Sequence, residues 1–128
     1  MKTEAGTDRV VPIHSKIRQF VLRKYKEAET LGSKYLFNCV EANTQKNSTM
    51  LTYDRYQRRF SKIRLELKLN ILHRPHDCRV QFITSAKKYG VDEYAIKYMV
   101  GHTISDITEK VYTKREFDWL KEEIEKIK

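Results

Sequence analysis

The chain has 128 residues, of which 40% are hydrophobic and 11% aromatic; this length and composition suit one folded domain and argue against a disordered tail. No apolar run approaches the roughly 20 residues of a membrane span, and the polar start, Met1–Thr7, does not resemble a signal peptide. The formal net charge of +9, from 26 Lys and Arg against 17 Asp and Glu, favours a polyanionic partner because binding releases the partner's counterions.

A short β-branched segment, Arg9–Ile13, predicts a strand, with Pro12 near its end where an edge strand tolerates it. The residues before it, Lys2–Asp8, predict a turn. A hairpin needs a further strand on the far side of that turn, and nothing in the sequence precedes Met1. We therefore expect the chain to be a fragment of a longer protein.

From Ser15 onwards the sequence is typical of helices. Ser15 and Gly32 mark the start and the stop of a first helix. A second helix follows Thr52 and carries an apolar stripe at helical spacing, which consists of Tyr56, Phe60, Ile63 and Leu67. Its other face is cationic and consists of Arg55, Arg58, Arg59, Lys62 and Arg64.

The second half of the chain carries further helix signals, from capping residues and from proline and glycine. Predicted starts are Pro75, Asp92, Ser105 or Asp106, and the Thr113–Glu116 capping box; predicted stops are Gly90 and Gly101. The last helix has an apolar side made of Phe117, Leu120, Ile124 and Ile127. Together these signals predict a mainly α fold with a small β element at its start.

Two stretches contain residue types that suit phosphate chemistry. On a helix that begins near Pro75, His76 and Arg79 share a face, where arginine offers a hydrogen-bonding fork and histidine can move a proton. Further on, Gly101-His102 is followed ten residues later by Tyr112. Each stretch also has an ordinary structural explanation. The first can be the basic start of a helix that Asp77 caps. In the second, the histidine can be a buried or capping residue and Tyr112 an aromatic residue of the core.

The order and spacing of these stretches resemble the signature of the tyrosine recombinases, the phage integrase family: His-x-x-Arg, then Gly-His, then Tyr. The segment from Lys2 to Ile13 resembles the family's lysine-bearing β-hairpin, which ends in a basic residue and a Val-Pro-aliphatic run. Met99–His102 resembles its aliphatic-Gly-His turn, and Tyr112-Thr113 resembles its Tyr-Thr-His ending, with Lys114 in place of histidine. The resemblance extends from Lys2 to about Lys114.

The resemblance implies a role for each matching residue. Tyr112 would be the nucleophile that forms a 3′-phosphotyrosyl link to DNA, and Arg79 would clamp the non-bridging oxygens. His76 would act as an acid/base and phosphate contact, and His102 would hydrogen-bond the phosphate. Lys2 would be the general acid that protonates the 5′-hydroxyl leaving group. Because side chains supply the cations, we expect no metal and no cofactor.

The resemblance also implies an organisation. Residues 1–128 would form a partial catalytic domain of the DNA breaking-rejoining fold, with residues 1–13 as the end of the β-hairpin and residues 15–128 as the helical body. The family's first arginine lies upstream of the hairpin, and its core-binding domain also precedes this chain. We therefore expect the fragment alone to cleave DNA poorly or not at all. Cys78 and Val80 depart from the residues usual beside the motif arginine.

The expected function is site-specific recombination for a mobile element or phage, in the bacterial cytoplasm at the nucleoid. Expected partners are double-stranded DNA and further copies of the chain in a tetramer, with no membrane and no small-molecule substrate. On the second helix, Arg55, Arg58, Arg59 and Lys62 are candidate phosphate contacts. The last helix is most simply core packing, although in the family this segment often docks onto a neighbouring protomer.

Three alternatives stand beside this interpretation. A zinc site built from His73, His76, Cys78 and Cys39 lacks any paired Cys-x-x-Cys or His-x₃₋₅-His spacing. A non-catalytic basic DNA- or RNA-binding module explains the charge but not the catalytic order of residues. A type IB topoisomerase shares the chemistry, but the hairpin and the Gly-His turn fit the integrase branch better.

Overall fold

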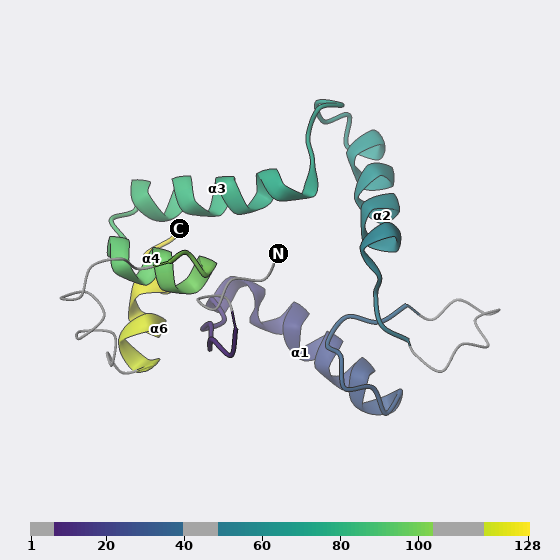
Figure 1. Cartoon of the computed structure of the whole chain (residues 1–128), viewed down its shortest axis with the longest axis horizontal. Helices are drawn as coiled ribbons and strands as arrows, with labels where there is room; N and C mark the ends of the chain where they lie inside the picture. Colours follow the sequence, from purple (N-terminus) through teal and green to yellow (C-terminus); the bar gives the residue numbers. More distant parts are fainter. Residues whose placement is uncertain (1–6, 40–48, 104–116) are drawn as a thin grey trace. The chain divides into compact units, whose positions relative to one another are not determined.

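The computed structural model describes residues 7–39, 49–103 and 117–128. Within these ranges it is mostly helical, which confirms the predicted fold class (Figure 1). The described helices are α1 (Ser15–Thr30), α2 (Tyr53–Glu66), α3 (Pro75–Lys88), α4 (Glu93–Val100) and α6 (Phe117–Glu125). None of them is long and apolar enough to cross a membrane. The predicted helix start near Ser105 and the Thr113–Glu116 capping box lie outside the described residues.

Helices α1, α3 and α4 each end within two residues of a glycine that the sequence predicts as a stop, Gly32, Gly90 and Gly101. At the end of α1, the Gly32 N–H donates to the Glu29 carbonyl (3.0 Å) and the Ser33 N–H donates to the Ala28 carbonyl (2.9 Å). This pair of bonds is the usual glycine stop of a helix. Thr52 is the residue before α2, as predicted, but its side chain makes no capping hydrogen bond.

The structure shows no strand over residues 9–13, in contrast to the sequence prediction. A strand needs a neighbouring strand to bond its backbone groups. Here the Val10 N–H donates instead to the Tyr98 hydroxyl (3.4 Å), so this segment is held by the side chain of a helix residue. The described residues do contain one isolated antiparallel β-bridge, between Asn38 and Met50.

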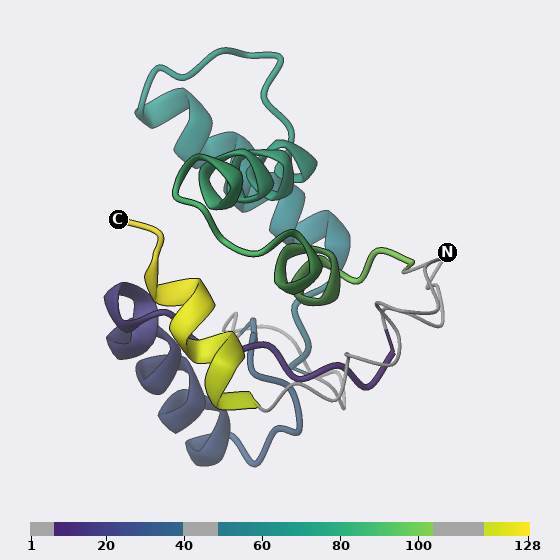
Figure 2. The same ribbon diagram turned by 90° about the vertical axis from the view of Figure 1, so that its left-hand side faces the viewer.

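The chain divides into two compact units, and the first comprises Met1–Ser15 and His76–Lys128. Its core is an apolar cluster contributed by α3, α4, α6 and the loop after α3, and consists of Ala86, Val91, Ala95, Ile96, Met99, Leu120 and Ile124. Figures 1 and 2 show α4 next to the carboxyl end of α3. Two of the four apolar residues predicted for the last helix, Leu120 and Ile124, are buried in this core.

Polar contacts add to the attachment of α6 within the first unit. The buried carboxylate of Glu123 accepts a hydrogen bond from the Asp92 backbone N–H (2.8 Å). Glu125 accepts two from Ser15, one from its N–H (2.6 Å) and one from its hydroxyl (2.7 Å). The His14 ring lies 2.8 Å from the Ile127 carbonyl oxygen. In this structure the C-terminal helix therefore packs on its own chain.

The second unit, Lys16–Pro75, contains a buried asparagine, Asn38. The side-chain oxygen of Asn38 accepts hydrogen bonds from Ser33 (2.7 Å) and Thr49 (2.6 Å), and its amide donates to the Tyr35 carbonyl (2.7 Å). These bonds connect the residues just after α1 to Thr49, which lies shortly before α2. No residue of α2 is buried. The predicted apolar stripe therefore lies on one face of the helix but is not part of a buried core.

Candidate functional site

Two of the predicted site residues, His76 and Arg79, lie in the amino-terminal half of α3, three residues apart and therefore on one helix face. Pro75 begins the helix, where a missing backbone N–H costs nothing. His76 is exposed and Arg79 is half-buried. The local geometry that the sequence predicts for this pair is thus confirmed.

Arg79 also makes a tertiary contact. Its Nη2 donates a hydrogen bond to the main-chain oxygen of Val100, the last residue of α4. The last carbonyls of a helix have no partner within the helix and form the negative end of its dipole, so a guanidinium is a favourable partner. This bond brings the His-x-x-Arg helix to the residue directly before Gly101-His102.

The turn that carries His102 is fixed by its backbone. Gly101 has a φ of 72°, a left-handed conformation that favours glycine because it has no Cβ. Its N–H donates to the Tyr98 carbonyl (3.1 Å), and the His102 N–H donates to the Lys97 carbonyl (2.9 Å). His102 itself is exposed. The backbone of His102 is therefore defined, and its ring is accessible to a ligand.

A second arginine binds the same helix end. Arg9 Nε donates to the Met99 carbonyl (3.1 Å), one residue before the carbonyl that Arg79 binds. Sequence reasoning noted Arg9 only as the basic residue at the end of the predicted hairpin. Its acceptor is a main-chain oxygen, so the pattern of side chains in the sequence could not predict this contact.

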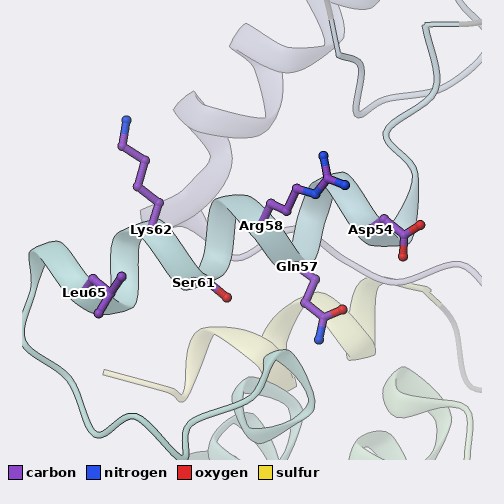
Figure 3. A pocket seen from close by; sticks show the side chains of 6 residues that line it. All are labelled: Asp54, Gln57, Arg58, Ser61, Lys62 and Leu65. Atoms are coloured by element: carbon purple, nitrogen blue, oxygen red, sulfur yellow. The ribbon is translucent and has the colours of Figure 1, made fainter.

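The cationic residues predicted to contact DNA, Arg55, Arg58, Arg59 and Lys62, all lie on α2. With four neighbours on the same helix, Arg58 and Lys62 line an open hollow whose residues are Asp54, Gln57, Arg58, Ser61, Lys62 and Leu65. Figure 3 shows Arg58 and Lys62 on one side of α2, and Gln57 and Ser61 on the other. Lys62 Nζ lies 3.9 Å from a Glu66 oxygen.

Arg64 differs from the other cations of α2. Its Nη1 donates to the carbonyls of Ile71 (2.6 Å) and His73 (2.9 Å), in the loop between α2 and α3. This arginine therefore shapes the chain that leads into the His-x-x-Arg helix. Sequence reasoning placed it with the cationic face and missed this structural contact.

The family comparison decides the class of the protein. The model described as Phage integrase family matches residues 1–118 of the chain. The chain belongs to the phage integrase family. Searches of curated proteins and of solved structures gave no match. Membership of this family implies that DNA is the substrate and that site-specific recombination is the general activity.

Two of the integrase's predicted catalytic residues, Lys2 and Tyr112, lie outside the described residues. The structure therefore brings together the α3 motif and the Gly-His turn, while the positions of the hairpin lysine and the tyrosine stay predictions. Within residues 7–39, 49–103 and 117–128, no group of three or more histidine, cysteine or acidic residues is placed to hold a metal ion.

Proposed function

We propose that the integrase cleaves and rejoins DNA through a 3′-phosphotyrosyl intermediate on Tyr112. The observation that carries the proposal is the bond between Arg79 and the Val100 carbonyl, because it joins two motifs of the catalytic signature that lie 21 residues apart.

In the proposed site, Arg79, His76 and His102 bind the scissile phosphate. A guanidinium has five N–H donors, and the bond to Val100 uses one of them. The remaining donors suit the non-bridging oxygens, whose charge grows in the transition state. His76 and His102 are both exposed, so each ring is accessible to a phosphate.

The reaction is an exchange of phosphodiester bonds. The Tyr112 oxygen attacks phosphorus, and the bond from phosphorus to the 5′-oxygen breaks. A phenol has a pKa near 10, so it needs a cationic site to react at neutral pH. His76 accepts the phenol proton, and Lys2 donates a proton to the departing 5′-oxygen. Attack by another 5′-hydroxyl reverses these steps and releases Tyr112.

The cationic face of α2 supplies the proposed DNA contacts outside the reacting centre. Lysine and arginine contacts to phosphates provide affinity without reading sequence. Arg55, Arg58, Arg59 and Lys62 have this role in the proposal, and the net charge of +9 supports it. We further propose a tetramer on DNA and a mobile element or phage as its source; the cytoplasmic location stays a prediction.

A nicked DNA substrate that traps the covalent intermediate tests the proposal. The assay uses the full product of the gene. DNA comes from the ends of the element that carries the gene, and Tyr112→Phe is the control. We expect a protein–DNA band on a denaturing gel that the variant lacks. A variant that still forms the band would refute Tyr112 as the nucleophile. Tight binding without any band would favour a non-catalytic DNA-binding module.

A further inference from the structure

We propose that Glu123, on the C-terminal helix α6, is a positioning residue for His102 and acts through helix α4. Its carboxylate holds the residue at the start of α4, and His102 follows the end of the same helix. The family model matches residues 1–118, so Glu123 lies beyond the part of the chain that this match covers. This role deepens the proposed function and rests on it. Two experiments separate a failure of the role from a failure of the proposed reaction.

Glu123 is a buried carboxylate with two defined partners. Its side chain is only 8% exposed. One carboxylate oxygen accepts a hydrogen bond from the Asp92 backbone N–H (2.8 Å), and the other accepts one from Lys126 Nζ (2.7 Å). A carboxylate is costly to bury unless it is paired and hydrogen-bonded, so these partners determine where it lies. The Asp92 backbone is therefore held at a fixed place on α6.

Asp92 in turn holds the start of α4. Its side chain accepts hydrogen bonds from the backbone N–H groups of Tyr94 (3.0 Å) and Ala95 (3.2 Å), which makes it the N-cap of the helix. Helix α4 has eight residues. Isolated helices of this length are marginal in water, so α4 depends on its cap and on tertiary contacts. Glu123 thus binds the residue on which the first turn of α4 depends.

The other end of α4 leads into the proposed site. The Val100 carbonyl accepts from Arg79, and the His102 N–H donates to the Lys97 carbonyl (2.9 Å). Five of the eight residues of α4 are buried, so the helix is packed along its length. A helix of eight residues is about 12 Å long and is stiffened by its own hydrogen bonds. A displacement of its start is therefore carried to the turn that holds His102.

The first test measures the rate of covalent adduct formation by the full gene product, in single-turnover reactions at saturating nicked DNA. Glu123→Ala should slow this reaction about 10- to 100-fold, since small displacements of a reacting group have effects of this size. Glu123→Gln should be slowed less, because its amide oxygen can still accept from the Asp92 N–H. DNA affinity should stay close to that of the parent, because Glu123 is buried and offers DNA no contact.

A double-mutant cycle with His102→Ala shows whether Glu123 acts through His102. Residues that act as a unit give non-additive losses, whereas a general weakening of the fold lowers the rate by the same factor in either background. In the His102→Ala background, Glu123→Ala should therefore slow the reaction only a few-fold. A loss of the same size in both backgrounds would overturn the proposal, as would a parental rate for Glu123→Ala.

Matched variants keep this test decisive. Glu122→Ala removes an exposed carboxylate from the same helix and should leave the rate and the DNA affinity unchanged. All rates are compared at a temperature at which urea unfolding shows each variant to be folded. If Glu123→Ala does not fold, Glu123→Gln takes its place in the cycle, with the same outcomes.

The second test does not depend on catalysis. Amide hydrogen exchange is measured in the DNA-free protein at Asp92, Gly101 and His102. Glu123→Ala should speed exchange at Asp92, whose N–H loses its acceptor, and also at the Gly101-His102 turn, while the amides of α2 stay unchanged. Faster exchange at Asp92 alone would overturn the link through α4. A parent protein that forms no adduct, while its turn still responds to Glu123→Ala, would refute the proposed reaction and uphold this link.

Discussion

Arg79 on α3 donates a hydrogen bond to the main-chain oxygen of Val100, the final residue of α4. The bond joins the helix that carries His76 to the turn that carries His102. It also satisfies a carbonyl that has no partner within its own helix. One side chain thus connects the two motifs structurally and is a candidate ligand for the phosphate.

Replacing Arg79 with lysine should show whether adduct formation requires the shape of the guanidinium or only its positive charge. Lysine keeps the charge but lacks the planar fork, so it cannot bind the Val100 carbonyl and a phosphate in the same way. We expect covalent adduct formation by the full gene product to fall on the order of 100-fold, the usual effect of removing one preorganised donor. DNA affinity should fall much less. Arg74→Lys, directly before α3, is the control and should be close to the parent; an active Arg79→Lys enzyme would contradict the proposed clamp.

Gly101→Ala should displace His102 and weaken the fold. Gly101 has a φ of 72°, where an added Cβ costs about 1–2 kcal/mol. The free energy of unfolding, measured with urea, should fall by about that amount, and adduct formation should fall with it. Gly101→Asn should be milder, because asparagine visits this conformation more readily. Equal stability of the alanine variant and the parent would show that the turn relaxes at no cost.

Arg58 and Arg64 should differ although both belong to α2. Arg58→Ala removes a proposed phosphate contact, so the slope of log affinity against log salt should become shallower by about 0.9. Arg64→Ala should keep the slope but lower the free energy of unfolding by about 0.5–1.5 kcal/mol, because the exposed Ile71 and His73 carbonyls lose their donor. Filter binding across a salt series and urea unfolding measure the two effects. Identical behaviour of the two variants would contradict this division of roles.

Glu125 should make stability depend on acid pH. The Ser15 hydroxyl, the Ser15 backbone N–H and the nearby His14 lower the pKa of the Glu125 carboxyl below its ordinary value. A carboxyl with a lowered pKa stabilises the fold above its ordinary pKa, and this contribution is lost as pH falls through the folded value. Urea unfolding from about pH 6 to about pH 3 should therefore show a smaller loss of stability in Glu125→Gln than in the parent. Glu122→Gln, on the same helix, is the matched control and should follow the parent.

The sequence alone predicted most of the helices and the family. Helix starts and stops depend on neighbours within about one turn, so Asp92, Gly32 and Gly101 could be assigned from local rules. The apolar residues Leu120 and Ile124 were placed in the core by their spacing alone. The family followed from the order of short motifs along the chain, which needs no coordinates.

The tertiary structure decided what those local rules do not cover. Arg79, Arg9 and Arg64 each bind main-chain oxygens of segments distant along the chain. Every residue has a main-chain oxygen, so the pattern of side chains cannot predict which of these oxygens accepts a hydrogen bond from a given arginine. The same limit explains why residues 9–13 looked like a strand: their composition favours extended backbone, but a strand also requires a partner, and here helix α4 provides the contacts instead.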